Sequence, residues 1–230
     1  MERFKLNKRG FTLAETLITL AIIGVVAAIT IPMIITKYQK QVTVEKLKKM
    51  YNNMNSIMQM AVNDNGDMST WDFSEQSLLN ANSNFYKTYF EPYIKTIKRN
   101  RYYINNSSYT TYINNIHGNN LYQYASWQIL PDGTSIALLN NSGGGYFWIF
   151  TDITGPKRPN RLGKDIFMME LDVKHNKVRF NCESCNDSLI MSTSSGYYGC
   201  NKMNLSNYAG GNCGAKILKD GWKISDDYPW

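Results

Sequence analysis

An apolar run near the amino terminus places one carboxylate inside a segment long enough to cross a membrane. From Phe11 to Thr36 the only charged residue is Glu15, and Ile, Leu, Val and Ala dominate the rest. A helix of about 20 apolar residues crosses the roughly 30 Å hydrocarbon core while satisfying its own backbone hydrogen bonds. A charge there costs about 2.5 to 3.5 kcal/mol by insertion scales, so we expect Glu15 to have a partner.

The residues before this run predict its orientation. Residues 1–10 carry four basic side chains against one acidic side chain. By the positive-inside rule this end stays in the cytoplasm and the remainder lies outside. An ordinary secretory signal peptide, with Ala27 and Ala28 near its cleavage site, is the alternative. Signal peptides have apolar cores of only about 7 to 15 residues, so we favour a retained anchor.

The sequence Gly10-Phe11-Thr12-Leu13-Ala14-Glu15, followed by an apolar run that closes with Ile31-Pro32, resembles the prepilin segment of type IV pilins and type II secretion pseudopilins. The resemblance covers roughly the first 30 residues. It implies that a prepilin peptidase cuts between Gly10 and Phe11 and methylates the new amino terminus at Phe11. Ala14 and Thr16 depart from the usual bulky aliphatic residues, but neither supplies the scissile glycine or the charge.

The same resemblance implies a partner for Glu15. In the family, this glutamate pairs with the amino-terminal amine of a neighbouring subunit as subunits stack in a fibre. A carboxylate and an ammonium that meet in a dry helix bundle neutralise each other, whereas an unpaired charge keeps its desolvation penalty. Assembly is therefore expected to involve Phe11, Glu15 and the helix around Pro32.

Location and partners follow from the resemblance as well. It implies a single-pass protein of the bacterial cytoplasmic (inner) membrane, with its amino terminus inside and its head in the periplasm or outside the cell, later part of a fibre. The implied partners are prepilin peptidase, copies of this chain, other pilins or pseudopilins, and the inner-membrane assembly machinery. The sequence does not distinguish secretion, DNA uptake, motility and adhesion.

A stripe of apolar residues continues the helix beyond the membrane-length run. Leu47, Met50, Met54, Met58 and Ala61 recur at spacings of three and four, which is typical of an amphipathic helix. We expect a bent helix of about 50 residues, because a proline within it removes a backbone bond. Asn63 to Asp67 should end it.

The predicted fold class is α+β, a pilin-like arrangement in which the long helix packs on an antiparallel sheet, with a disulfide-containing carboxy-terminal region. We expect four segments: a removed leader (1–10), a transmembrane and polymerisation helix (11–36), its amphipathic continuation (37–65), and an exported globular head (66–230).

Within the head, turn signals separate the expected elements. Pro131-Asp132-Gly133-Thr134 is a turn sequence, since Pro presets one dihedral angle and Gly accepts a positive one. It should join strands 125–130 and 135–139 in a hairpin. Further expected elements are one or two short helices within 74–97 with Pro92 disturbing the end, loop with one short strand in 99–124, strands at 146–151 and 166–173, a turn at 173–178 leading into a strand at 179–180, and helix 213–222.

All four cysteines lie beyond residue 180, namely Cys182, Cys185, Cys200 and Cys213. Disulfides persist in exported domains, and four cysteines allow three pairings. We favour Cys182 with Cys185 and Cys200 with Cys213, while the crossed pairings stay open. Zinc binding and redox chemistry are the alternatives for the Cys-x-x-Cys spacing. Cys200 and Cys213 are too loosely spaced for the second half of a zinc site and have no His near them, and a redox pair usually precedes a helix, whereas this pair follows an expected strand.

Net charge gives little reason to expect nucleic acid as a partner. The chain carries a formal charge of +7, of which residues 1–10 contribute +3. The basic cluster 95–101 is more typical of an exposed loop. The alternative function, a minor pilin whose head binds DNA or a surface, is based on this cluster and on the Tyr- and Asn-rich stretch after it.

The segment 151–165 is the one loop with a chemical hypothesis. It resembles a loop pattern, Asp-x-Asn-Gly-x-Lys-x-Pro-Asn-x-x-Gly-x-Asp, of some uncharacterised pilin-like proteins, with Ile153-Thr154 replacing one residue pair. Asp152, Asn160 and Asp165 could supply oxygens to calcium, which takes six to eight such ligands. The alternative is that both Asp residues cap turns, and the four basic residues of the loop oppose a cation site.

An enzyme is the hypothesis with least support. The only histidines are His117 and His175, and no nucleophile, metal or phosphate motif accompanies them. We therefore expect no catalytic residue, and no cofactor other than calcium.

Overall fold

The computed structural model divides the chain into two compact units, residues 1–41 and 42–230. Helix α1 (Leu13–Asn65) contributes to both units. It is the one helix of the described residues that is long and apolar enough to cross a membrane. The structure describes residues 10, 12–74, 84–95, 98–101, 113–122, 126–141, 146–155, 157, 159–194 and 198–230.

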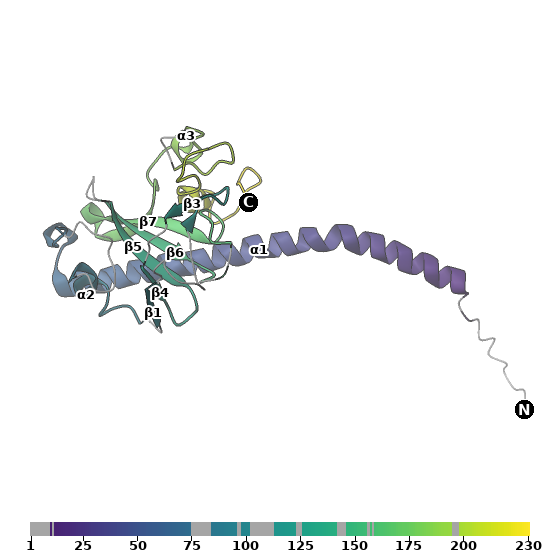
Figure 1. The fold of residues 1–230 in the computed structure, drawn as a ribbon, viewed down its shortest axis with the longest axis horizontal. Helices are drawn as coiled ribbons and strands as arrows, with labels where there is room; N and C mark the ends of the chain where they lie inside the picture. Colours follow the sequence, from purple (N-terminus) through teal and green to yellow (C-terminus); the bar gives the residue numbers. More distant parts are fainter. Residues whose placement is uncertain are drawn as a thin grey trace, which may run out of the picture. The chain divides into compact units, whose positions relative to one another are not determined.

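In its described residues, the second unit combines short helices with strands (Figure 1). The helices after α1 are η1 (Met68–Thr70), α2 (Asn84–Tyr89), η2 (Val173–His175), α3 (Asp187–Ile190) and α4 (Cys213–Lys219). The strands are β1 (Lys98–Arg101), β2 (Ile113–Asn114), β3 (Asn120–Tyr122), β4 (Ser126–Ile129), β5 (Ser135–Asn141), β6 (Tyr146–Asp152), β7 (Ile166–Asp172) and β8 (Lys177–Phe180).

Among the residues that the structure describes, six strands form one antiparallel sheet in the order β1-β4-β5-β6-β7-β8, and β2 pairs with β3 separately. The predicted hairpin is present: Trp127 lies opposite Ala137, and Gly133 in the turn adopts a φ of 82°. The α+β class with a long amino-terminal helix and an antiparallel sheet is therefore confirmed.

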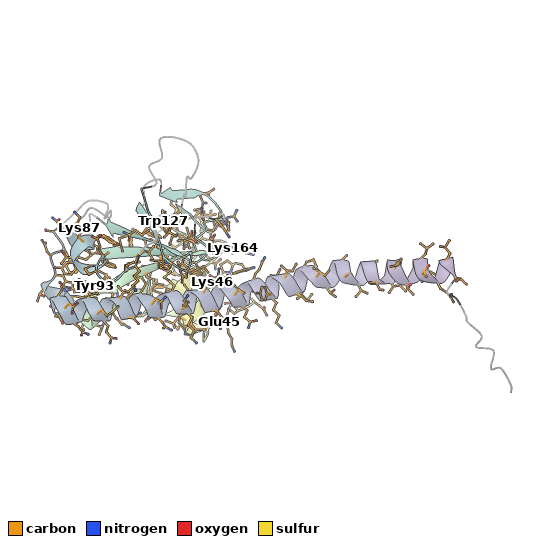
Figure 2. All side chains as sticks on the ribbon, turned by 90° about the horizontal axis from the view of Figure 1, so that it is seen from below. Glu45, Lys46, Lys87, Tyr93, Trp127 and Lys164 are labelled. Carbon is orange, nitrogen blue, oxygen red and sulfur yellow. A yellow bond between two sulfur atoms is a disulfide. The ribbon has the colours of Figure 1, made fainter. Side chains whose placement is uncertain are left out.

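Both faces of the sheet are buried, which makes β7 apolar on both sides. Because side chains alternate along a strand, Phe167 and Met169 join the core that contains α1, whereas Ile166 and Met168 join a second core on the opposite face. The second core includes Trp127, which Figure 2 shows on the side of the sheet away from α1.

Helix α1 supplies the largest continuous strip of the first core. Leu47, Met54 and Met58 are completely buried there, as the helical spacing predicts. The side chain of Asn55 accepts a hydrogen bond from the N–H of Val178 at 2.9 Å, which ties the helix to β8. Figure 2 shows Lys46 on the side of the helix toward the sheet and Glu45 away from it. The Lys46 ammonium donates to the carbonyl of Ile153 at 3.3 Å.

The sequence explains where α1 ends and where its backbone bonding is interrupted. Gly66 follows the last helical residue with a φ of 80°, a conformation that glycine adopts without strain, and its N–H donates to the carbonyl of Val62. The helix continues without interruption through Pro32. Since proline has no N–H, the carbonyl of Ala28 loses its usual donor there.

One expectation for the middle of the chain needs correction. Segment 99–124 was expected to hold one short strand, but its described part holds the end of β1 together with β2 and β3. Sheet pairing overrides the low strand propensity of asparagine here, because β1 is satisfied by β4. For the one or two short helices expected within 74–97, the described part contains α2, which is six residues long and ends at Tyr89 before Pro92; residues 75–83 and 96–97 lie outside the described residues.

The packing of α1 predicts a strong contrast between two methionines of the same helix. Met54 is completely buried and Met60 is 45% exposed. Met54→Ala should lower the free energy of unfolding by roughly 2–5 kcal/mol, because it leaves a cavity in the core, while Met60→Ala should change it by less than about 0.5 kcal/mol. Urea unfolding of the full chain in detergent, followed by tryptophan fluorescence, measures both. Equal effects would contradict the core assignment.

Candidate functional site

Glu15 lies in the first turn of α1 and is hydrogen-bonded to Thr12. One carboxylate oxygen, Oε2, accepts the Thr12 N–H at 2.8 Å and the Thr12 hydroxyl at 2.9 Å. In return, the Thr12 hydroxyl accepts the Glu15 N–H at 3.2 Å. This reciprocal arrangement is a capping box, which satisfies two N–H groups that otherwise lack partners at a helix start. The other oxygen of Glu15, Oε1, accepts no hydrogen bond from a described residue.

Sequence reasoning missed the role of Thr12. The signal was available, because a Thr followed three residues later by Glu at the start of an apolar run is the sequence signature of a capping box. Gly10, the predicted processing residue, lies just before this turn; it is exposed, and a Cβ built on it would contact nothing within 4 Å. Phe11 lies outside the described residues.

The first half of α1 presents an apolar surface. Its large apolar side chains from Leu13 to Ile35 are 48% to 79% exposed. Several hydroxyl groups in this segment bond to backbone carbonyls of the preceding turn, as Thr30 does to Val26 and Thr36 to Pro32. The hydroxyl groups of the segment are therefore satisfied by its own backbone, while its surface suits lipid or other apolar helices.

The structure pairs Cys182 with Cys185 and Cys200 with Cys213, the pairing favoured from the sequence. Cys200 and Cys213 are completely buried in the first core, where their disulfide connects the start of α4 to the preceding loop. Since all four thiols are in disulfides, these cysteines are not ligands for zinc in this structure.

The loop between β6 and β7 brings Asp152, Asn160 and Asp165 into one buried cluster; all three are at most 5% exposed. Asp165 accepts the N–H groups of Asn160 at 2.7 Å and of Arg161 at 2.6 Å. The Thr154 hydroxyl lies 3.0 Å from Asp152 Oδ1 and 3.4 Å from Asp165 Oδ2. Both carboxylates thus cap turns, as the alternative hypothesis predicts. Both also lie close to the hydroxyl of Thr154.

Two polar atoms of this cluster are buried without a hydrogen-bond partner in the described structure, namely Oδ2 of Asp152 and Oδ1 of Asn160. Burial, together with the nearby charge of Asp165, raises the pKa of Asp152 to about 8. Burial also raises the pKa of Asp165, although hydrogen bonds from Arg161 and Asn160 oppose it. Two carboxylates at one dry site are unfavourable unless a cation or a proton accompanies them.

The basic cluster 95–101 is only partly described. Lys95 is exposed, and residues 98–101 form β1 at the edge of the sheet. Residues 96–97 and 102–112 lie outside the described residues, and with them most of the Tyr- and Asn-rich stretch. The head-binding alternative therefore stays a hypothesis from the sequence.

Two protein families together match nearly the whole chain. Residues 33–230 match a family of unknown function, DUF6613. The chain belongs to this family. Residues 5–31 of this DUF6613 member match the prokaryotic N-terminal methylation motif, which confirms the resemblance to type IV pilins and pseudopilins. No curated protein and no solved structure matches the chain significantly.

The acid pair predicts an unusual pH dependence of stability. An unfolded Asp ionises near 3.8, but folded Asp152 keeps its proton until about 8. With EDTA present, the free energy of unfolding should therefore fall as the pH rises from about 4 to 8. Asp165 is the charged group that faces Asp152, and Lys46 on α1 contacts the adjacent Ile153.

Thermal unfolding of the full chain across this pH range measures the effect, and Asp152→Asn should flatten it. The matched control is Asp132→Asn. Partial burial favours a higher pKa at Asp132, but hydrogen bonds from Thr134 and Lys49 lower it overall. That control should keep the loss of stability toward pH 8. A profile unchanged by Asp152→Asn would contradict the assignment.

Proposed function

We propose that this chain is a non-enzymatic fibre subunit of the type IV pilus or type II secretion kind, made as a membrane-inserted precursor. The observation that carries the proposal is the methylation motif at residues 5–31, which runs directly into a helix with an exposed apolar surface. In the proposal, prepilin peptidase cuts after Gly10 and Phe11 becomes the N-methylated first residue.

The proposed topology places the basic leader in the cytoplasm and the head outside the cytoplasmic membrane. The excess of positive charge in residues 1–10 supports this orientation. Two disulfides in the carboxy-terminal region support an oxidising compartment for the head.

The first half of α1 would serve twice. It spans the membrane before assembly, and in the fibre it packs against the same segment of other copies. The continuity of α1 into the head supports this use, because movement of the apolar half out of the bilayer carries a folded head with it. Pro32 leaves one carbonyl without its helical donor, which makes this the point where the helix bends most easily.

Glu15 would direct the register between copies. Its Oε2 is used by Thr12, whereas Oε1 is available to the new amine of Phe11 on a neighbouring copy. Before assembly the capping box keeps the carboxylate hydrogen-bonded at the start of the helix, where the helix dipole also favours a negative charge.

Processing gives the first test. When the precursor is expressed with a prepilin peptidase, intact-mass measurement should find a chain that begins at Phe11 and carries one added methyl group. Gly10→Ala should leave the precursor uncut. Gly24→Ala is the matched control, because a Cβ at that glycine of the apolar helix would contact nothing within 4 Å, and it should be processed normally. A wild-type chain that keeps residues 1–10 would refute the proposed processing.

Assembly gives a second test, which separates charge from helix capping. Glu15→Gln keeps a residue that can complete the capping box but removes the charge, so it should be processed normally and fail to form fibres. Thr12→Ala weakens the cap by about 1 kcal/mol and retains the charge, so it should still assemble. Fibre yield from sheared cells measures both. Normal fibres from Glu15→Gln would exclude the charge pair.

A further inference from the structure

A cavity of about 240 Å³ lies in the head, beside the turn that precedes β7. Its lining comes from stretches of chain that are far apart in the sequence, within residues 116–117, 161–164, 202 and 229–230. All of these residues belong to the second unit. Pockets for drug-sized ligands typically measure about 300 to 1,000 Å³, so this cavity suits a smaller molecule.

Hydrogen bonds between these stretches hold the walls of the cavity in place. The N–H of Leu162 donates to the carbonyl of Asn114 at 2.8 Å. Nε2 of His117 lies 2.6 Å from the carbonyl oxygen of Asn204, which can only accept, so this ring nitrogen is the donor. The walls are therefore formed by the folded head itself, as is usual for small-molecule sites.

Three basic side chains, those of Arg161, Lys164 and Lys202, line the cavity. No Asp or Glu is among its described lining residues. Within the described part of the chain, no carboxylate forms an ion pair with any of the three basic side chains. A cleft lined by one sign of charge concentrates ions of the opposite sign, so this cavity favours an anion.

Two of the three basic side chains rest against neighbouring residues. A Cβ built on Gly118 would lie 2.9 Å from Nη2 and 3.2 Å from Cζ of Arg161, so the guanidinium packs against this glycine. The ammonium of Lys164 lies 5.6 Å from the ring centre of Trp230, within the range of a cation–π contact. Side chains that are already held in this way lose less conformational freedom when a ligand binds.

The charge of the cavity favours a phosphate ester over a carboxylate. A phosphate monoester carries about −1.5 to −2 at pH 7 and presents three acceptor oxygens, whereas a carboxylate carries a single charge. Arg can bind phosphate through two parallel hydrogen bonds, and Lys binds it as a point charge. Three cations at one cavity therefore match a phosphate group in charge and in the number of acceptors.

The remaining wall of the cavity includes the apolar side chains of Ile116, Leu162 and Pro229 and the ring of Trp230. Such a wall suits the less polar face of a small ring. We propose that this cavity binds a monosaccharide phosphate, with the phosphate on the three basic side chains and the sugar ring against the apolar wall. The proposal does not depend on fibre assembly.

Calorimetric titration of glucose 6-phosphate into the full chain tests the proposal, with the protein in detergent at low ionic strength and without phosphate buffer. We expect about one ligand per chain. Binding should weaken as NaCl is added, because salt screens the attraction between charges. Inorganic phosphate should bind more weakly, since it lacks the ring, and glucose should give no heat of binding, since it lacks the charge.

Substitutions separate this cavity from the net charge of the head. Arg161→Gln should weaken binding roughly 10- to 100-fold, as expected for the loss of a hydrogen bond between charged groups. The N–H of Arg161 that donates to Asp165 belongs to the backbone, so this variant keeps that contact. Lys202→Gln should also weaken binding. Lys157→Gln is the matched control, because Lys157 is exposed in the same loop and is not among the lining residues, and its binding should be unchanged.

Several results would overturn the proposal. Absence of heat with millimolar glucose 6-phosphate at low salt would exclude the site, and equal heat from glucose would show that charge is not recognised. Equal affinity for inorganic phosphate would remove the sugar from the assignment. An equal loss of binding in Lys157→Gln would assign the effect to net charge. A DNA duplex that binds where glucose 6-phosphate does not, and that Arg161→Gln weakens, would make this surface a nucleic-acid site instead. The wild-type titrations require no variant, so a poorly folding mutant leaves the test valid.

Discussion

The structure of this chain depends on how one helix divides its surface between two environments. From Val44 onward, α1 buries every third or fourth residue in the core of the head, where Leu47, Met54 and Met58 are completely buried. Before that point its large apolar side chains are exposed. The hydrophobic effect therefore acts on both halves, but only the second half finds its apolar contacts within the same chain.

The head is organised to hold that second half firmly. One apolar face of the sheet packs on α1, and loops from the carboxy-terminal region pack on the other face. Strand β7 therefore lies between the two cores. A hydrogen bond from Val178 of β8 to Asn55 supplements the packing, and the Cys200–Cys213 disulfide lies in the same core as α1.

The sequence predicts the regular elements well, because their signals are local. The stripe from Leu47 to Ala61 and the Pro131–Thr134 turn each have a periodicity or a turn chemistry that a short window contains, and the structure agrees with both. Strands β2 and β3 were missed because their short polar segments are stabilised by pairing and by contacts such as Asn114 to Asn160, not by intrinsic preference. The loop 151–165 was harder to interpret because sequence gives the number of its charges and not their directions. Arg161 and Lys164 proved to point away from the acid pair, and Thr154, a departure from the loop pattern, proved to connect the two carboxylates.

In the proposed fibre, the exposed half of α1 is covered by other copies of the same chain. A photo-crosslinking amino acid at Ile22, which is 59% exposed, tests this in cells of the native host. Illumination should produce a ladder of crosslinked copies that disappears when Gly10→Ala blocks processing, while the same probe at Met60 in the head should not reproduce that ladder. A chain that remains monomeric after illumination, or a ladder unaffected by Gly10→Ala, would contradict packing between processed copies.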